Sequence, residues 1–278
     1  MLYHFTSIHD VVSPYLFNIP HTGTLLPLTD SERALWTKDD QSTQRLVEGI
    51  ADLSVDQTVS SAISAHNASA IQSNVSRCYV DVERFIGEAE EMNAVGMGAV
   101  YTHGIYGEPL YLDELPHNTI DKRLENIYYP YHAQLNALCE QTIQQFGYCM
   151  IFDIHSYNPR PLPFELHQDE PRNEIILGVN HNQTPLQQQH LIALYAGFSE
   201  AGYDVGINTA YKGSIIPSAH MEDPRVSSVM IEIRKDMYLK NNEVIDSKAE
   251  RINDTLNTIL HDLRQHELEH ELPKDIVS

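Results

Sequence analysis

The sequence predicts an α/β fold in which helices cover both faces of a mostly parallel or mixed central sheet. Short apolar runs typical of buried strands recur along the 278 residues, and longer stretches with helical periodicity lie between them. This alternation is typical of parallel strands joined by crossover helices. No repeat, low-complexity tract or linker divides the sequence, so we expect residues 1–278 to form one domain.

The strand predicted around residues 148–157 is the most informative one. A glycine precedes its apolar run and Asn158-Pro159 follows, which sets both ends of the strand. The run ends with Asp153, His155 and Ser156. These side chains should lie at the carboxyl edge of the sheet, where open α/β sheets bind ligands. The other predicted strands cover residues 15–19, 75–82, 175–179, 203–207 and 228–233.

Two helix starts are expected from capping boxes. Thr29 with Glu32 has the required spacing, and Thr37 with Asp40 repeats it. Apolar residues at helical spacing continue the second of these helices to Leu53. Further helices are expected over residues 120–146, where Pro130 should kink or divide the helix, over 185–201 and over 242–268.

Composition and charge limit the classes of partner. A formal net charge of −21 argues against nucleic acid or an anionic membrane, and it leaves only 18 basic residues, whose positions are therefore informative. No apolar run approaches the roughly 20 residues that span a bilayer, and Met1–Phe5 lacks the features of a signal peptide. Cys78, Cys139 and Cys149 are scattered in apolar surroundings, as is typical of free thiols, so we expect a cytoplasmic protein.

Residues with metal-binding chemistry are predicted at or near several strand ends. His21 follows the first predicted strand, His155 ends the central one, and Asp39 or Asp40 lies between them in sequence. Two histidines and one carboxylate form a common catalytic zinc set, which leaves a fourth position for water. Glu232 interrupts an apolar strand and would then be the general base.

Each of these residues also has a structural interpretation. His155 could cap a strand end, and Asp40 could be the acid of its capping box. Glu232 could pair with Arg234 or Arg225. The distribution of these residues over separate strand ends favours the metal site.

A series of short segments has the order and spacing of a known family. The segments are Pro20–Gly23, Asp40 with Arg45-Leu46, Ser76-Arg77 through Asp81 to Arg84, Gly107–Tyr111, Arg123, Pro130–His132, Asp153–Ser156, Asn208, Tyr211–Gly213, Glu232 and Tyr238. With them, the sequence resembles the N-formylglutamate amidohydrolases (N-formylglutamate deformylases) from about residue 15 to about residue 240.

The resemblance implies a zinc-peptidase-like α/β fold, as in carboxypeptidases and peptidoglycan amidases, with one zinc ion per chain. By position, the zinc ligands fall on His21, Asp40 and His155, and the base falls on Glu232. The expected substrate-binding residues, of which the basic ones would hold carboxylates, are Arg77, Arg84, Lys212, Ser156 and Asn208. The arginines could instead form salt bridges with nearby acids.

The sequence departs from the family pattern at several positions. Gln41-Ser42 replaces Trp-His after Asp40, and Glu83 replaces an asparagine. Helical phase favours Asp39 over Asp40 on the apolar face, so both acids are candidates for the third ligand. Pro217-Ser218 stands where the family tends to have Thr-Arg, which affects the substrate more than the chemistry.

We therefore expect zinc-dependent hydrolysis of the formyl amide of N-formyl-L-glutamate to formate and L-glutamate, a step of histidine catabolism. The same chemistry on another N-acyl amino acid or on a peptide carboxyl terminus is an alternative. A metal-free binding protein is a second alternative, from another class. The expected partner of a hydrolase with these residues is a small anionic substrate.

Overall fold

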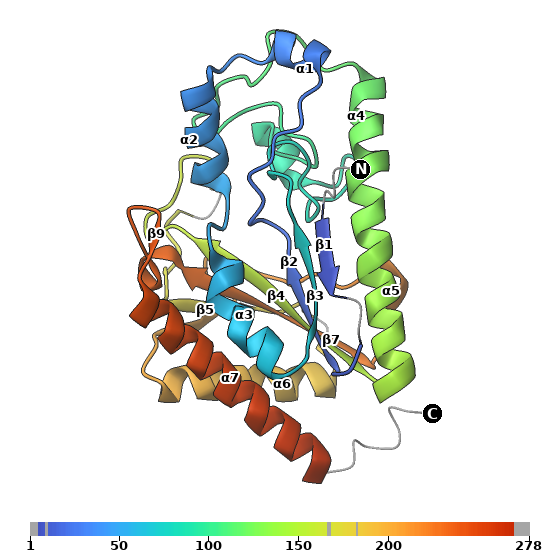
Figure 1. Cartoon of the computed structure of the whole chain (residues 1–278), viewed down its shortest axis with the longest axis vertical. Coiled ribbons are helices and arrows are strands. Elements are labelled where there is room, and N and C mark those ends of the chain that lie inside the picture. The colour runs from blue at the N-terminus through green and yellow to red at the C-terminus, as the bar shows by residue number, and fades with distance from the viewer. Residues whose placement is uncertain (1–4, 9–10, 166–167, 182, 270–278) are drawn as a thin grey trace.

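The centre of the fold is a pair of long parallel strands, β4 (Cys149–Tyr157) and β7 (Val226–Arg234). They belong to a seven-stranded sheet in the computed structural model, which describes residues 5–8, 11–165, 168–181 and 183–269 (Figure 1). The remaining strands of this sheet are β1 (Phe5–Ile8), β2 (Tyr15–Ile19), β3 (Ser69–Ser73), β5 (Ile175–Gly178) and β6 (Val205–Ile207). Their order is β1-β3-β2-β4-β7-β5-β6.

The sheet is mixed, as the sequence predicts. β3, β2, β4 and β7 run parallel to one another. By contrast, β1 is antiparallel to β3, and β5 is antiparallel to β7. The carboxyl ends of β2, β4 and β7 consequently meet at one edge of the sheet, and the polar residues at these ends are brought together there.

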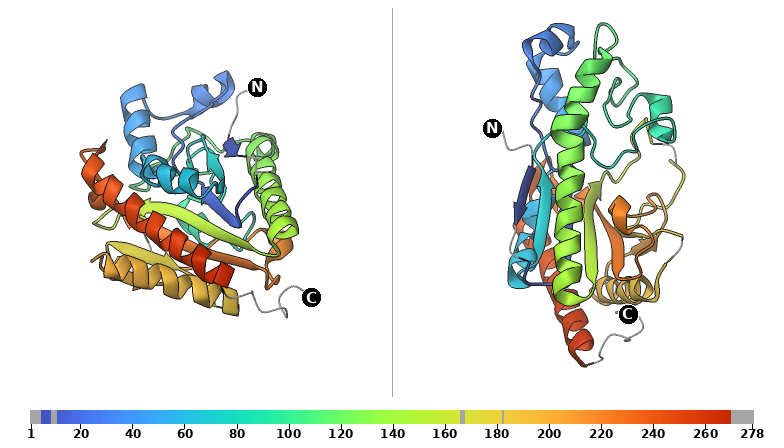
Figure 2. Two further views of the ribbon diagram at one scale, coloured as in Figure 1. Left: turned by 60° about the horizontal axis from the view of Figure 1, so that its bottom comes forward. Right: turned by 90° about the vertical axis from the view of Figure 1, so that its right-hand side faces the viewer.

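Helices cover both faces of the sheet (Figure 2). Their bounds are α1 (Asp30–Leu35), α2 (Asp40–Ile50), α3 (Val55–Ala65), α4 (His117–Arg123), α5 (Tyr129–Phe146), α6 (Pro185–Glu200) and α7 (Asp246–Glu269). On one face α3, α6 and α7 pack with Phe17 and Phe152, and on the other α5 packs with Leu16 and Ile151. Since successive strand residues point to opposite faces, strands covered on both sides are apolar almost throughout.

The strand predictions are confirmed with one exception. Residues 15–19, 148–157, 175–179, 203–207 and 228–233 correspond to β2, β4, β5, β6 and β7. The strand predicted over residues 75–82 is wrong, because Val75 forms an isolated bridge and Tyr79 and Val80 then donate their amides to the Ser76 carbonyl in a turn. Val75, Tyr79, Val80 and Val82 of this segment are buried against α5, which explains the strand-like pattern. Besides β1 and β3, the hairpin of β8 (Leu239–Lys240) and β9 (Glu243–Val244) was not expected.

The first predicted capping box is confirmed and the second is wrong. At the start of α1, Glu32 N donates to Thr29 Oγ1 and Thr29 N donates to Glu32 Oε2. The N-cap of α2 is Asp39 instead of Thr37, and the Asp39 carboxylate accepts from Ser42 N at 2.7 Å. A capping role therefore accounts for Asp39.

A break separates α2 from α3. The helical pattern continues to Leu53 in the sequence, but α2 ends at Ile50 and α3 begins at Val55. Ala51 is extended, and Ser54 has a positive φ of 59°. These conformations turn the chain between the two helices towards the edge where β2 and β4 end.

The helix predicted over residues 120–146 is not divided at Pro130, because α4, a π-helical turn and α5 follow one another without a gap and form one continuous helix (Figure 1). α4 ends at Arg123, a π-helical turn follows over Leu124–Tyr128, and α5 begins at Tyr129. Pro130 lies inside this continuous helix, directly after the π-helical turn, in which Tyr129 N donates to Leu124 O five residues back. The wider turn accommodates a residue that has no N–H to donate.

The cysteine prediction is also confirmed, since Cys78, Cys139 and Cys149 are free and buried. Among the described residues, no helix is both long and apolar enough to cross a membrane. Met1–His4, on which most of the expectation about a signal peptide depends, lies outside the described residues.

Candidate functional site

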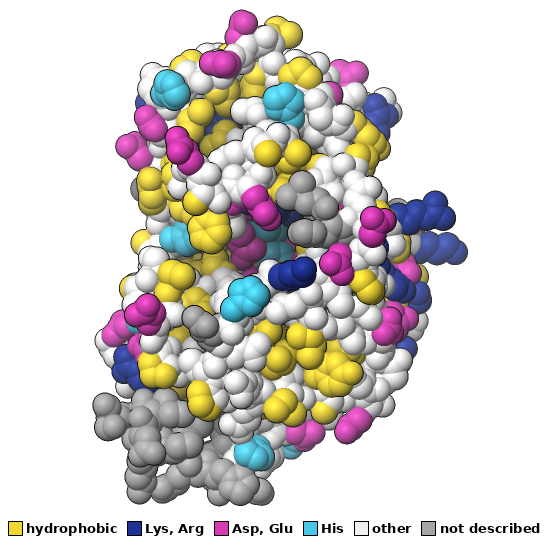
Figure 3. Space-filling model, turned by 180° about the vertical axis from the view of Figure 1, so that it is seen from behind, with side chains coloured by type: hydrophobic (Ala, Val, Ile, Leu, Met, Phe, Trp, Pro, Cys, Tyr) yellow, Lys and Arg dark blue, Asp and Glu magenta, His cyan; other side chains and the backbone are white. Residues whose placement is uncertain are grey.

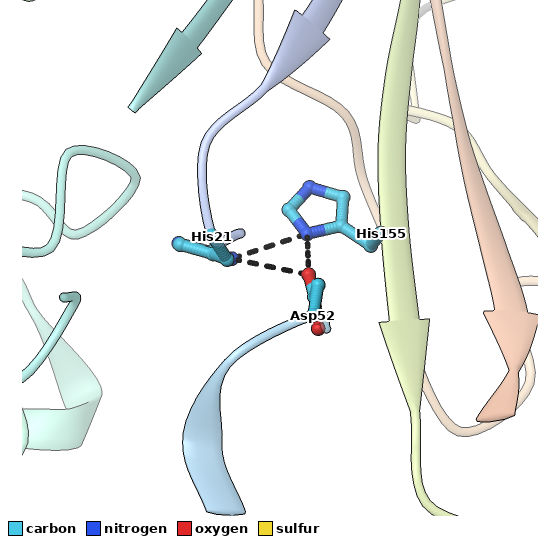
Figure 4. Close-up of side chains that lie close together, drawn as sticks. All are labelled: His21, Asp52 and His155. Atoms are coloured by element: carbon cyan, nitrogen blue, oxygen red, sulfur yellow. Dashed lines mark hydrogen bonds and ion pairs between the residues drawn. The ribbon is translucent and has the colours of Figure 1, made fainter. Parts of the chain in front are cut away.

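Two histidines and one aspartate converge at the carboxyl ends of β2 and β4 (Figure 4). The Nδ1 atoms of His21 and His155 are 3.2 Å apart. Asp52 Oδ2 lies 3.3 Å from His155 Nδ1 and 3.8 Å from His21 Nδ1. All three side chains are buried, and Asp52 Oδ2 has no hydrogen-bond partner. The structure thus brings His21 and His155 together, with a carboxylate beside them.

Local chain geometry brings His21 to this position. Pro20 ends β2, and the chain then passes very close to the segment that follows β3. A Cβ on Gly23 would lie 2.4 Å from the Asn74 carbonyl carbon, so only glycine fits at this crossing. Any larger residue would push the loop, and His21 with it, out of place.

A carboxylate orients the His21 ring. His21 Nε2 lies 2.8 Å from Asp81 Oδ1. Asp81 in turn accepts from Arg77 Nε at 2.9 Å and from the Tyr101 hydroxyl at 2.9 Å. Burial alone would raise the pKa of Asp81, but the charge of Arg77 and the hydrogen bond from His21 outweigh it and hold the pKa well below its usual range. An ionised carboxylate only accepts, so His21 Nε2 carries the proton of this bond.

The protonation of His21 follows from this arrangement. Burial lowers the pKa of the His21 imidazole to about 4, with a further contribution from the Arg77 charge. The ring is therefore neutral at pH 7. Because its proton is on Nε2, Nδ1 presents a lone pair to His155 and Asp52, which is the form in which histidine binds a metal.

Two acids hold the His155 ring in the same way. His155 Nε2 lies 2.9 Å from Glu83 Oε2 and 3.1 Å from Asp153 Oδ1. Asn18 Nδ2 donates to both acids, at 2.8 Å and 2.9 Å, and the Tyr131 hydroxyl donates to Asn18 Oδ1. His155 Nδ1 is consequently directed towards Asp52 and His21.

The pKa values of the two acids beside His155 are shifted in opposite directions. Burial and the Asp153 charge raise the pKa of Glu83 to about 7. Burial also disfavours ionised Asp153, but the charge and hydrogen bond of His155 outweigh it, and the Asp153 pKa falls to about 2. Burial likewise opposes a charge on His155, yet the two acids raise its pKa well above the usual value. Without a cation in the site, His155 is therefore the positive partner of these acids.

Glu232 is a further buried titratable group of the site. It lies opposite His155 in the register of β4 and β7, and its Oε2 has no hydrogen-bond partner. Burial raises the pKa of Glu232 to about 8. The structural alternative for this residue is not observed, because Arg234 pairs with Asp236 and Arg225 with Asp223. A buried carboxyl without a partner is costly, which favours a chemical role.

The structure does not bring Asp40 or Asp39 to the histidines. Both are exposed at the start of α2, and Asp39 serves as its N-cap. The carboxylate that joins the histidines is Asp52, whose amide donates to the His21 carbonyl at 2.9 Å. Ser156 Oγ donates to Asp52 Oδ1 at 3.2 Å, so Ser156 is occupied in holding this acid.

Two of the expected substrate-binding residues lie elsewhere in the fold. Asn208 accepts from Val179 N at 2.9 Å and donates to Val179 O at 3.0 Å, which uses its amide to join the ends of β5 and β6. Lys212 is half exposed, and its Nζ lies 3.9 Å from Glu170 Oε1.

The two expected arginines differ in how fully they are paired. Arg77 forms a two-atom pair with Asp81, with both nitrogens within 2.9 Å of Oδ2. Arg84 lies at 3.7 Å from both Asp81 and Glu90, and its buried Nε has no hydrogen-bond partner. On the face shown in Figure 3, acidic and histidine side chains lie at the bottom of a hollow that has a basic side chain at its rim.

Comparison with known proteins identifies the family. The model of the N-formylglutamate amidohydrolase family matches residues 13–239, a span that contains His21, Asp52, His155 and Glu232. The chain belongs to this family. It is accordingly a hydrolase that acts on an amide bond, and the predicted family is confirmed.

Two curated relatives of this amidohydrolase carry the name N-formylglutamate deformylase. The protein of Pseudomonas putida is 27% identical over 252 residues, covering 85% of this chain and 86% of the relative. The protein of Pseudomonas aeruginosa is 25% identical over 240 residues, covering 81% and 82% of the two chains.

Solved structures confirm the fold. The N-formylglutamate amidohydrolase of Ralstonia eutropha superposes with a TM-score of 0.76 at 21% identity, covering 94% of this chain and 99% of the other. A gene product of Agrobacterium tumefaciens gives a TM-score of 0.68 at 17% identity, with coverage of 94% and 96%.

Proposed function

We propose that this amidohydrolase removes the formyl group of N-formyl-L-glutamate in a zinc-dependent reaction. The products are formate and L-glutamate, as in the degradation of histidine. The names of the curated relatives support this substrate. The observation that carries the proposal is the convergence of His21 Nδ1, His155 Nδ1 and Asp52 Oδ2 within 4.8 Å of one another.

The donor atoms fit one zinc ion per chain. Two imidazole nitrogens and a carboxylate oxygen are a common catalytic set for this metal. Asp52 Oδ2 is buried without a hydrogen bond, and an ion would satisfy it. Both imidazoles have their Nε2 atoms on carboxylates, as zinc-bound histidines generally do. When bound in such a set, zinc leaves a position for water and lowers the pKa of that water to about 7.

Glu232 is the general base of the proposed reaction. Its carboxylate takes the proton of the water that attacks the formyl carbon, and it returns this proton to the nitrogen of the departing glutamate. The buried position of Glu232 favours its protonated form, which suits the second of these transfers. General acid–base catalysis of this kind contributes about 10²–10⁴-fold to the rate.

Arg84 is the proposed anchor for a substrate carboxylate. N-formyl-L-glutamate carries two carboxylates, and a guanidinium binds such a group through two parallel hydrogen bonds. Arg84 has unused donors, whereas the Arg77 donors at Asp81 are occupied. Arg77 instead holds the Asp81 carboxylate, which in turn orients the His21 ring.

Another N-acyl amino acid, or a peptide carboxyl terminus, is a second candidate substrate. It is favoured by two observations: Lys212 lies at the surface beside Glu170, and Pro217-Ser218 stands where the family tends to have an arginine. A substrate with a single carboxylate would need only Arg84. A substrate panel separates the two candidates.

Purified protein should therefore contain about one zinc per chain and release formate from N-formyl-L-glutamate. Removal of the metal by a chelator should abolish formate release, and added zinc should restore it. The panel should include N-acetyl-L-glutamate, N-formyl-L-aspartate and N-formyl-L-norvaline, which change the acyl group, the chain length and the side-chain charge. Full formate release by metal-free protein would contradict the mechanism, and a preference for the uncharged side chain would favour the second substrate class.

A further inference from the structure

The acid proposed as the third ligand lies on a short connection between two helices. Asp52 is in the break between α2 and α3, flanked by Ala51 and Leu53. Its position relative to the histidines depends on this connection, because no regular secondary structure includes it. A ligand on such a segment needs other contacts to hold its backbone, since misplacement by about 1 Å can cost a site most of its function.

Side chains from the end of β7 hold both carbonyls that flank Asp52. Lys235 Nζ donates to the Ala51 carbonyl at 2.7 Å. The Tyr238 hydroxyl donates to the Leu53 carbonyl at 2.9 Å, and Tyr238 is fully buried. The Asp52 amide itself donates to the His21 carbonyl at 2.9 Å. The backbone around the acid is thus fixed on three sides.

The same chain segment connects the acid to the proposed base. Lys235 directly follows β7, the strand that carries Glu232. The register of β7 with β4 sets Glu232 opposite His155. Burial lowers the pKa of Lys235, while the charges of Asp52 and Glu232 oppose this effect, so its ammonium lies within the electrostatic reach of both acids.

We propose that Lys235 and Tyr238 are positioning residues that hold Asp52 in the geometry required for metal binding. This inference rests on the proposed function, because it assumes a metal at His21, Asp52 and His155. Neither side chain touches the metal or the substrate in this role. Both residues follow β7, the strand that carries Glu232, and both act on the backbone that flanks Asp52.

The test measures zinc affinity by competition with a chromophoric chelator, together with the thermal stability of the metal-free protein. Lys235→Met should weaken zinc binding by about 10–100-fold, the usual cost of losing a residue that orients a metal ligand. Lys235→Arg, which keeps a cationic donor, should recover most of this loss. Arg251→Met is the matched control, because Arg251 Nη2 also donates to a backbone carbonyl, that of Ala201 at 2.6 Å, which belongs neither to the Asp52 connection nor to the turn that carries Lys235. Its zinc affinity should equal that of the wild type.

A double-mutant cycle shows whether Lys235 acts through Asp52. Asp52→Ala should itself weaken zinc binding, and adding Lys235→Met should then cause no further loss. Tyr238→Phe removes only a hydroxyl and should weaken zinc binding in the same direction, which keeps the test decisive if Lys235→Met does not fold.

Three results would overturn the inference. Unchanged zinc affinity in Lys235→Met and Tyr238→Phe, with lower thermal stability alone, would make both residues purely structural. An undiminished effect of Lys235→Met in the Asp52→Ala background would show that it acts by another route. Zinc affinity that is unaffected by Asp52→Ala would instead remove Asp52 from the metal set, and so refute the proposed function together with this inference.

Discussion

His155 and Glu232 lie directly opposite each other on the adjacent parallel strands β4 and β7. The ladder that joins these strands runs for their full length, from Cys149 opposite Val226 to Tyr157 opposite Arg234. A proposed metal ligand and the proposed base are therefore held in fixed register, buried near the carboxyl ends of two neighbouring strands. Neither residue depends on a loop for its position, which is the arrangement that a catalytic pair requires.

Replacing Glu232 by glutamine should separate catalysis from metal binding. Glutamine keeps the shape of the side chain and removes its basicity. We expect kcat to fall by about 10²–10⁴-fold, with zinc content and circular dichroism unchanged. The comparison uses formate release and metal analysis on the same preparations. Loss of zinc would make Glu232 a ligand, and full activity would leave it a structural residue.

The raised pKa of Glu232 should make the free energy of unfolding of the metal-free protein depend on pH. Burial raises this pKa from 4.5 to about 8, so between these values the folded protein binds a proton that the unfolded chain does not. Stability should then fall as pH rises through this window, by at most about 1.4 kcal/mol per pH unit from this group. Metal-free Glu232→Gln lacks this titration, so its stability relative to metal-free wild type should increase from pH 4.5 to pH 8 in urea unfolding. A difference that stays constant with pH would contradict the raised pKa.

Removal of the Arg84 guanidinium should weaken substrate binding. In Arg84→Ala we expect KM for N-formyl-L-glutamate to rise by up to about a hundredfold, which corresponds to a charged hydrogen bond of roughly 1.5–3 kcal/mol. Zinc content should not change. Arg45→Ala, at an exposed position on α2, is the control. Equal kinetic constants for Arg84→Ala and the wild type would reduce Arg84 to a structural partner of Asp81 and Glu90.

Arg123 should contribute to stability, although its segment matches the family pattern. Its Nε donates to Glu32 Oε1 at 2.8 Å, its guanidinium lies 3.8 Å from the centre of the Tyr79 ring, and both partners of the ion pair are buried. Arg123→Met leaves the buried Glu32 carboxylate without its counter-ion, so we expect a loss of about 3–5 kcal/mol in urea unfolding. The exposed control Arg33→Met should stay within about 0.5 kcal/mol. A second change, Glu32→Gln, should restore part of the stability, and failure to do so would argue against the unpaired charge as the cause.

Sequence reasoning located the parts of the site that depend on local pattern. β4 and β7 are apolar runs buried on both faces, so a histidine or glutamate near their carboxyl ends is conspicuous. His21 follows Pro20, which ends β2. Each of these positions can be read from a few neighbouring residues, because strand ends at one edge of a parallel sheet meet in space.

Asp52 could not be found in this way. Leu53 continues the helical pattern of α2, so the sequence does not reveal the break at Ala51. The backbone at Asp52 is held beside the histidines by hydrogen bonds with His21 and Lys235, which are distant in sequence. The two acids favoured by the sequence, Asp39 and Asp40, occupy a helix start instead, where acidic residues are common for local reasons. The incorrect strand at residues 75–82 has a similar origin, because burial alone does not distinguish a ladder from a buried turn.

The most direct test of the account compares Asp52→Ala with Asp40→Ala in zinc content and formate release. The two changes remove the same group from the same region of the chain, but only Asp52 lies with His21 and His155. We predict that Asp52→Ala loses most of its zinc and its activity on N-formyl-L-glutamate together, while Asp40→Ala keeps both. Full zinc content and activity in Asp52→Ala would contradict the proposed metal centre.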